Sequence, residues 1–197
     1  MNIRPNLAFP IAGLALALLP LAHANQTISQ TSSDDMDELQ FFQPMGQSFT
    51  AEGAFLTDFQ FYIGPANQNW PVTSLSMEIL DGNGLGGSVL DSQTFSPGGG
   101  YQWLDWSLKL AVTSGNQYTA VITNSGSPYW GIDGYDGDAY SGGQAYVNNY
   151  PQYNTIGDFT FQATFASAAP DAASTLGLLG AGLGVLFLAG SRKRVSS

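Results

Sequence analysis

The feature that most constrains the fold is a strict alternation of apolar and polar residues that recurs along the chain. In residues 158–165, Phe159, Phe161, Ala163 and Phe165 alternate with polar residues. A period of two with one apolar face is typical of a half-buried antiparallel strand. The same alternation occurs in residues 58–63, 74–79 and 105–110.

Further strands and turns extend this pattern. Short strands are predicted at residues 47–50, 89–95, 117–124 and 144–147, and Gly-rich turn sequences separate many of them. No segment between the chain ends has the 3.6-residue period of an amphipathic helix. We therefore predict an all-β domain over residues 41–166, an antiparallel two-sheet β-sandwich of jelly-roll type. The polar, acidic residues 25–40 are expected to form a flexible leader.

The N-terminus has the pattern of a secretory signal. An apolar segment, residues 7–19, precedes Ala22 and Ala24, the small residues of a signal-peptidase site. We predict that residues 1–24 form a signal peptide and helix that signal peptidase removes, so that the mature chain begins at Asn25. An uncleaved N-terminal anchor is the alternative.

The C-terminus combines a polar motif, an apolar span and a basic cluster. Residues 172–190 are apolar, and about 19 residues at a rise of about 1.5 Å reach about 28 Å, enough for a transmembrane helix. The motif consists of Pro170, Asp171, Ser174 and Thr175, and the basic stop of Arg192, Lys193 and Arg194. The positive-inside tendency places the C-terminus in the cytoplasm and the preceding domain outside.

This arrangement resembles the PEP-CTERM class of bacterial sorting domains, in particular the variant built on Val-Pro-Asp-x-Gly-Ser-Thr. The resemblance covers residues 169–197, with Ala169 in place of Val and Ala173 in place of Gly. It implies recognition by an exosortase-type sorting enzyme, removal of the helix, and delivery to the cell envelope or extracellular matrix. The alternative is a helix that stays as a permanent anchor in the inner membrane.

The middle of the chain carries a looser resemblance. Segments such as Gln47-Ser48-Phe49-Thr50-Ala51 and Gly115-x-x-Tyr118-Thr119-Ala120-Val121, with Tyr129-Trp130-Gly131, resemble exported bacterial β-sandwich domains of the choice-of-anchor type. Those domains are similar in shape to carbohydrate-binding modules. The resemblance implies fold and surface exposure but no particular ligand.

Composition excludes several classes of function. The chain has 15 acidic and 5 basic residues, and Lys109 is the only basic residue outside the two end segments. Nucleic-acid binding depends on Lys and Arg, so it is excluded as a function of the domain.

Catalysis has few residue types to draw on. The only histidine, His23, lies in the predicted signal peptide, and the chain has no cysteine. Zinc sites of the usual kind and Ser-His or Cys nucleophiles are therefore excluded. A glycoside hydrolase would have to use carboxylates alone, and the glutamates Glu38, Glu52 and Glu78 are expected to be solvated. We predict that the protein is not an enzyme and leave a carboxylate-only hydrolase as the least favoured alternative.

Aromatic residues are the candidates for ligand binding. They concentrate in residues 127–153, among Gly, Asp and Asn, and a second group lies beside the Gly-rich turn at residues 96–100. Aromatic rings stack on sugar rings, so these groups suit a glycan, but the alternative is that Trp130 and some tyrosines fill the core. Trp106 is expected in the core by alternation. The candidate ligand-binding residues are Tyr129, Trp130, Tyr135, Tyr140, Tyr101 and Trp103.

The same region contains candidate metal ligands. Asp133, Asp136 and Asp138 lie close together among glycines, and such hard oxygen ligands suit Ca²⁺, although no cofactor is otherwise required. Together these features predict an exported structural or adhesive protein of the cell surface or extracellular matrix, in contact with extracellular polysaccharide. The alternative is a carbohydrate-binding module with a Ca²⁺ site.

Overall fold

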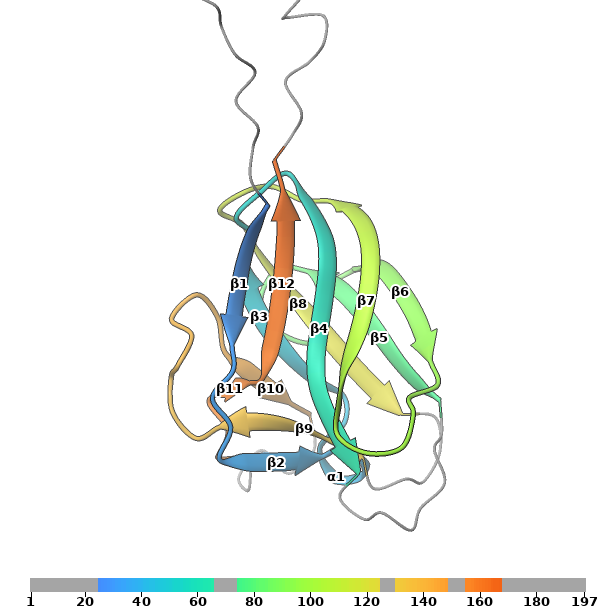
Figure 1. The fold of residues 1–197 in the computed structure, drawn as a ribbon. Coiled ribbons are helices and arrows are strands. Elements are labelled where there is room, and N and C mark those ends of the chain that lie inside the picture. The colour runs from blue at the N-terminus through green and yellow to red at the C-terminus, as the bar shows by residue number, and fades with distance from the viewer. Residues whose placement is uncertain (1–24, 66–73, 125–129, 149–154, 168–197) are drawn as a thin grey trace, which may run out of the picture.

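The computed structural model describes residues 25–65, 74–124, 130–148 and 155–167. These residues form two antiparallel β-sheets that face each other, with one short helix, α1 (Leu39–Phe42) (Figure 1). The predicted all-β class and two-sheet architecture are therefore confirmed.

The first sheet contains three of the four segments that follow the predicted alternation, and the fourth, residues 74–79, lies in the second sheet. Its strands run in the order β1-β12-β4-β9-β11, with β7 on the other side of β4 and β2 paired to β9. The strands are β1 (Gln26–Gln30), β2 (Asp35–Glu38), β4 (Phe55–Pro65), β7 (Gln102–Ala111), β9 (Trp130–Tyr135), β11 (Asp158–Phe159) and β12 (Phe161–Ala166).

The second sheet has five strands in the order β10-β3-β8-β5-β6. All its pairings are antiparallel, and β8 lies in the middle between β3 and β5. The strands are β3 (Met45–Thr50), β5 (Leu75–Asp81), β6 (Val89–Phe95), β8 (Gln117–Asn124) and β10 (Ala145–Val147).

The apolar members of the alternating segments form the core between the sheets. Phe59 on β4 lies 5.4 Å from Phe49 on β3 and 5.9 Å from Phe161 on β12, measured between ring centroids. All three side chains are fully buried. Burial of one such side chain contributes about 1.5 to 3 kcal/mol. An aromatic core of this kind supplies stability to a chain that has no cysteine for disulfides.

The prediction of a flexible leader over residues 25–40 is wrong. Residues 26–30 pair with β12 and residues 35–38 pair with β9. Low hydrophobicity suggested disorder, but strand pairing supplies the backbone hydrogen bonds, and Ile28 and Leu39 bury their side chains in the core. The folded domain therefore begins at β1 rather than at residue 41.

Both predicted processing signals lie outside the described residues. These are the signal peptide, with Ala22 and Ala24, and the C-terminal segment, with its sorting motif, apolar span and basic stop. Within the part of the chain that the structure describes, no helix is long and apolar enough to cross a membrane.

Candidate functional site

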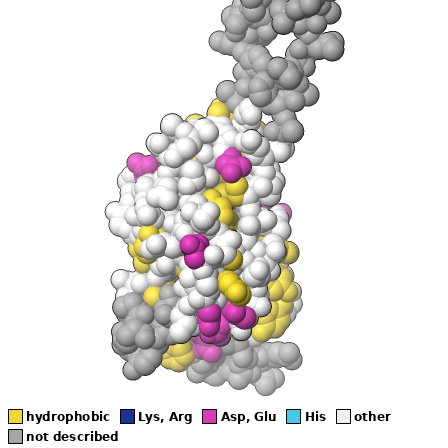
Figure 2. Space-filling view, turned by 90° about the vertical axis from the view of Figure 1, so that its left-hand side faces the viewer, with side chains coloured by type: hydrophobic (Ala, Val, Ile, Leu, Met, Phe, Trp, Pro, Cys, Tyr) yellow, Lys and Arg dark blue, Asp and Glu magenta, His cyan; other side chains and the backbone are white. Residues whose placement is uncertain are grey.

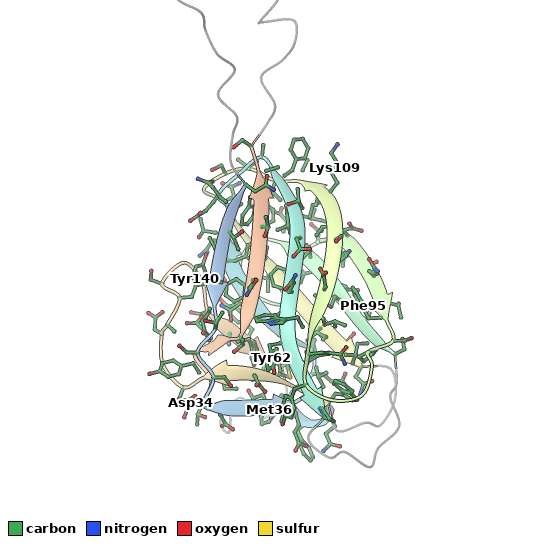
Figure 3. The ribbon with its side chains drawn as sticks, viewed as in Figure 1. Asp34, Met36, Tyr62, Phe95, Lys109 and Tyr140 are labelled. Atoms are coloured by element: carbon green, nitrogen blue, oxygen red, sulfur yellow. The ribbon has the colours of Figure 1, made fainter. Side chains whose placement is uncertain are left out.

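A row of aromatic side chains lies on the outer face of β4 and β7. Because Phe61 and Ile63 on β4 point into the core, the residue between them, Tyr62, points outward. Tyr62 is paired in register with Trp103 on β7, and their ring centroids lie 5.2 Å apart. Tyr101, just before β7, stacks on Tyr62 with centroids 6.2 Å apart and an interplanar angle of 25°. Figure 3 shows Tyr62 on the lower half of β4.

Local backbone features hold this row in place. The ring of Tyr101 lies directly over Gly64, where a Cβ would overlap it. Gly100 has a φ of +89°, which favours glycine, and it sets the turn that leads into Tyr101. Gln102 Nε2 donates a hydrogen bond of 2.9 Å to the carbonyl oxygen of Gly98 in the same turn. The turn and the contact with Gly64 therefore hold the Tyr101 side chain in one position, although 52% of its surface is exposed.

Polar side chains continue the same face along β4 and β7. Asp58 faces Ser107 across the two strands, and Gln60 faces Asp105. Gln60 Nε2 donates to Asp58 Oδ1 at 3.0 Å, and Ser107 Oγ donates to Asp58 Oδ2 at 3.5 Å. We call this surface the β4/β7 face; it consists of Asp58, Gln60, Tyr62, Tyr101, Trp103, Asp105 and Ser107.

The two carboxyl groups of this face influence each other. Burial, followed by the hydrogen bond and the negative charge of Asp105, raises the pKa of Asp58 to about 6, against the lowering effect of Gln60 and Ser107. Slightly acidic conditions therefore add a proton to Asp58.

The β4/β7 face has the chemistry of a glycan-contacting surface. Ring faces such as those of Tyr101 and Trp103 stack on the apolar faces of sugars, and amides, hydroxyls and carboxylates bond their hydroxyl groups. The structure brings together Tyr101 and Trp103, both predicted from the sequence, and adds Tyr62. The alternation at residues 58–63 indicated that Tyr62 points away from the core, but only the strand register reveals its position beside Trp103.

The aromatic residues of the segment 127–153 are arranged differently. Trp130 is only 2% exposed and belongs to the core, so the prediction that it contacts a ligand is corrected in favour of the core alternative. Tyr140 is half-buried: its ring packs edge-on against Phe161 at 5.1 Å, and its hydroxyl accepts a hydrogen bond from Thr50 N. Tyr135 is 37% exposed, and Tyr129 lies outside the described residues.

A buried aspartate explains why the segment after β9 is held inward. The carboxylate of Asp158 accepts hydrogen bonds of 2.9 Å from Gln47 Nε2 and from the backbone nitrogens of Ala139 and Tyr140. Burial raises the pKa of Asp158, and these hydrogen bonds oppose that rise. The Asp158 carboxylate thus links β3 to the segment that follows β9 through hydrogen bonds.

The three predicted calcium ligands do not assemble as expected. Asp133 Oδ2 accepts a hydrogen bond from Ser33 Oγ at 3.3 Å, and burial raises the pKa of Asp133. Asp136 Oδ1 accepts one from Thr155 Oγ1 at 2.9 Å. No group of three potential metal-ligating side chains, at Asp138 or elsewhere, is present in the described part of the chain.

Comparisons with known proteins do not assign this chain to a family. Neither a family model, nor a curated protein, nor a solved structure matches the chain. The β4/β7 face is therefore the strongest indication of function in the described residues.

Proposed function

We propose that this chain is an exported surface or extracellular-matrix protein whose domain contacts polysaccharide through the β4/β7 face. The observation that carries the proposal is the aromatic row of Tyr62, Tyr101 and Trp103, held in a fixed arrangement outside the core. Core packing does not explain the position of the Tyr101 ring, because the side chain is half exposed and the ring packs over Gly64 on the outer side of the sheet. The role is structural or adhesive.

Strand order supports a jelly-roll classification of the domain. The arrays β1-β12-β4-β7 and β3-β8-β5-β6 each contain four neighbouring antiparallel strands, and the chain crosses repeatedly between them. Two such arrays folded as Greek keys define a jelly roll, an architecture shared by lectin domains. This likeness of architecture is an analogy, and the ligand is argued from the face itself.

The position of the described ends supports a domain that is attached through its C-terminal segment and leaves the β4/β7 face free to bind. Residue 26 pairs with residue 165, so the described ends lie side by side at one end of the domain (Figure 1). Phe55 pairs with Ala166 at that end, and Tyr62 lies seven residues further along β4, about 23 Å away at about 3.3 Å per residue. A domain attached through its C-terminal segment would therefore present the aromatic row away from the attachment.

The fixed geometry of the rings also supports the narrower alternative, a module that selects one glycan. Preformed sites lose less conformational entropy on binding, and their spacing restricts which sugars fit. A catalytic role is not part of the proposal, because Asp58 and Asp105 are the only carboxyl groups on the face and it has no histidine, cysteine or lysine.

Binding of the purified protein to a panel of soluble and insoluble polysaccharides tests the proposal. Replacement of Tyr101 and Trp103 together by alanine should weaken binding more than tenfold, since each lost stacking contact removes about 1 kcal/mol or more. Tyr146→Ala is the matched control, because Tyr146 donates a hydrogen bond to Asn83 in a different part of the domain. Equal binding by wild type and the double variant would contradict the proposal. Selectivity for one polymer would favour the narrower alternative.

Export and sorting need a separate test. Intact mass and cell fractionation should find a released form that begins at Asn25 and ends near Pro170. Substitution of Pro170 and Asp171 should abolish this form if an exosortase-type enzyme recognises the motif. A full-length membrane form that is unaffected by the substitution would contradict sorting and favour a permanent anchor.

A further inference from the structure

Two carboxyl groups lie close together on the β4/β7 face. Asp58 on β4 faces Ser107, and Gln60 on the same strand faces Asp105, so Asp58 and Asp105 are diagonal neighbours on one side of the sheet. Such neighbours have Cα atoms about 7 to 8 Å apart. Burial first, and then the proximity of Asp105, raises the pKa of Asp58 to about 6. A positive group placed between the two carboxylates therefore stabilises both.

The immediate neighbours of these carboxyl groups are uncharged. Gln60 Nε2 and Ser107 Oγ, which donate hydrogen bonds to Asp58, are neutral donors. On the next strand, Thr164 is paired with Asp58 and is also neutral. Because hydrogen bonds from charged donors to carboxylates are stronger than those from neutral ones, this part of the face favours a ligand with a positive group.

The one basic residue of the described part of the chain lies beyond the face. Lys109 is the only Lys or Arg there, and its Nζ lies 5.7 Å from the centre of the Phe55 ring. It follows Asp105 by four residues on β7, about 13 Å at about 3.3 Å per residue, whereas charges in physiological salt are screened over about 8 Å. Figure 3 places Lys109 at the top of the domain, away from Tyr62.

The rest of the described surface is also acidic. Figure 2 shows several Asp and Glu side chains and no Lys or Arg among the described residues of that view. A field of this sign repels anionic polymers and attracts cationic ones. Polysaccharides that carry carboxylate or sulfate groups are therefore poor ligands for this domain.

The aromatic row favours a positive ligand as well. Trp103 precedes Asp105 by two residues on β7, so both lie on the outer side of the strand, about 7 Å apart along it. The faces of Trp and Tyr rings attract cations in addition to stacking on the apolar faces of sugars. A sugar chain stacked on Trp103 and Tyr62 therefore extends over the two carboxyl groups.

We propose that the β4/β7 face selects polysaccharides of amino sugars whose amino groups are free and positively charged. The aromatic row stacks on the sugar rings, and Asp58 and Asp105 pair with the ammonium groups. N-acetylation of the same sugars removes the charge and with it the charge-assisted hydrogen bonds. This inference rests on the proposed polysaccharide binding and names the substrate class of that site.

Calorimetric titration of the full chain in mild detergent at pH 6 tests the inference with two probes of equal length. One probe is a hexamer of glucosamine, and the other is the uncharged hexamer of N-acetylglucosamine. The wild type should bind the glucosamine hexamer at least tenfold more tightly at low salt, and added salt should reduce this preference because it screens ion pairs. Replacement of Asp58 and Asp105 together by asparagine should abolish the preference. Unchanged binding of the N-acetylated hexamer by that variant would show that its fold and aromatic row are intact.

A charge-matched control separates the face from a general attraction between a polycation and an acidic protein. Glu78→Gln combined with Asp81→Asn removes two negative charges from β5, which belongs to the other sheet. This variant should keep the preference for the glucosamine hexamer. An equal loss of preference in the control and in the Asp58 and Asp105 variant would overturn the inference.

Failure of this inference is distinguishable from failure of the proposed function. Equal wild-type affinity for the two hexamers, or binding to neither, would overturn the preference for amino sugars. The proposed function would stand in that case if the double replacement of Tyr101 and Trp103 weakened binding to another polysaccharide of the panel. An absence of binding to every polysaccharide tested would contradict both.

Discussion

The β4/β7 face and the end of the domain around β9 contain the same kinds of residue in opposite settings. On the β4/β7 face, Tyr101 is half exposed and Trp103 lies beside it on the outer side of the sheet, near Asp58 and Asp105. Around β9, Trp130 is buried in the core and Asp158 ties the following segment to β3. Local richness in aromatic residues is therefore a poor guide to exposure, whereas strand alternation and register decide it.

The largest expected effect concerns the two tryptophans. Trp130→Ala should destabilise the domain by about 3 to 5 kcal/mol, because it leaves a large cavity in the core. Trp103→Ala should cost less than about 1 kcal/mol, because its ring lies on the outer face. Urea unfolding of both variants measures the difference. Similar losses of stability in the two variants would contradict the assignment of Trp130 to the core and Trp103 to the outer face.

The next effect is a pH dependence at the β9 end. Burial, followed by the negative charges of Asp35 and Asp136, raises the pKa of Asp37 from about 3.8 when unfolded to about 7 in the folded protein, so the folded state holds the proton more tightly. The contribution of Asp37 to the free energy of unfolding should therefore be fully present near pH 4 and be lost as the pH rises to about 7, by about 1 to 2 kcal/mol once solvent screening is allowed for.

Asp37→Asn is the variant that isolates this contribution. It should flatten the fall of stability between pH 4 and pH 7, leaving the part that the raised pKa values of Asp58, Asp133 and Asp158 add in the same direction. Unfolding curves at several pH values provide the measurement. An unchanged pH profile in the variant would show that Asp37 is not the group responsible.

The smallest effect on stability is expected at Gly64. Gly64→Ala places a Cβ where the ring of Tyr101 now lies, so the ring must move away from β4. Because that ring is half exposed, we expect a change in unfolding free energy within about 1 kcal/mol but a clear change in the near-ultraviolet circular dichroism of the stacked rings. An unchanged spectrum would mean that Tyr101 is not held there.

Much of the fold follows from the sequence because one face of each long strand is buried. The alternation at residues 58–63 and 105–110 predicted which side chains enter the core, and Phe59 and Trp106 do so. The strands at residues 26–30 and 35–38 were missed, because their stability comes from backbone pairing to β12 and β9 rather than from an apolar face of their own.

The candidate site was less accessible to prediction. Tyr101 and Trp103 were identified because they follow the Gly-rich turn at residues 96–100. Their partner Tyr62, however, lies 39 residues before Tyr101 in the chain. Only the pairing of β4 with β7 brings them together. Trp130 was ambiguous for a different reason: the glycines at positions 131 and 134 favour a loop over a strand, whereas the structure has strand β9 there.

The most direct test of the central claim compares two exposed tyrosines, Tyr101 and Tyr135, which are 52% and 37% exposed. Binding isotherms should be measured with the best polysaccharide of the panel for wild type, Tyr101→Ala and Tyr135→Ala. We predict at least a fivefold loss of affinity for Tyr101→Ala and wild-type affinity for Tyr135→Ala, with all three proteins folded. Loss of binding in Tyr135→Ala alone would contradict the account and move the polysaccharide site to the β9 end.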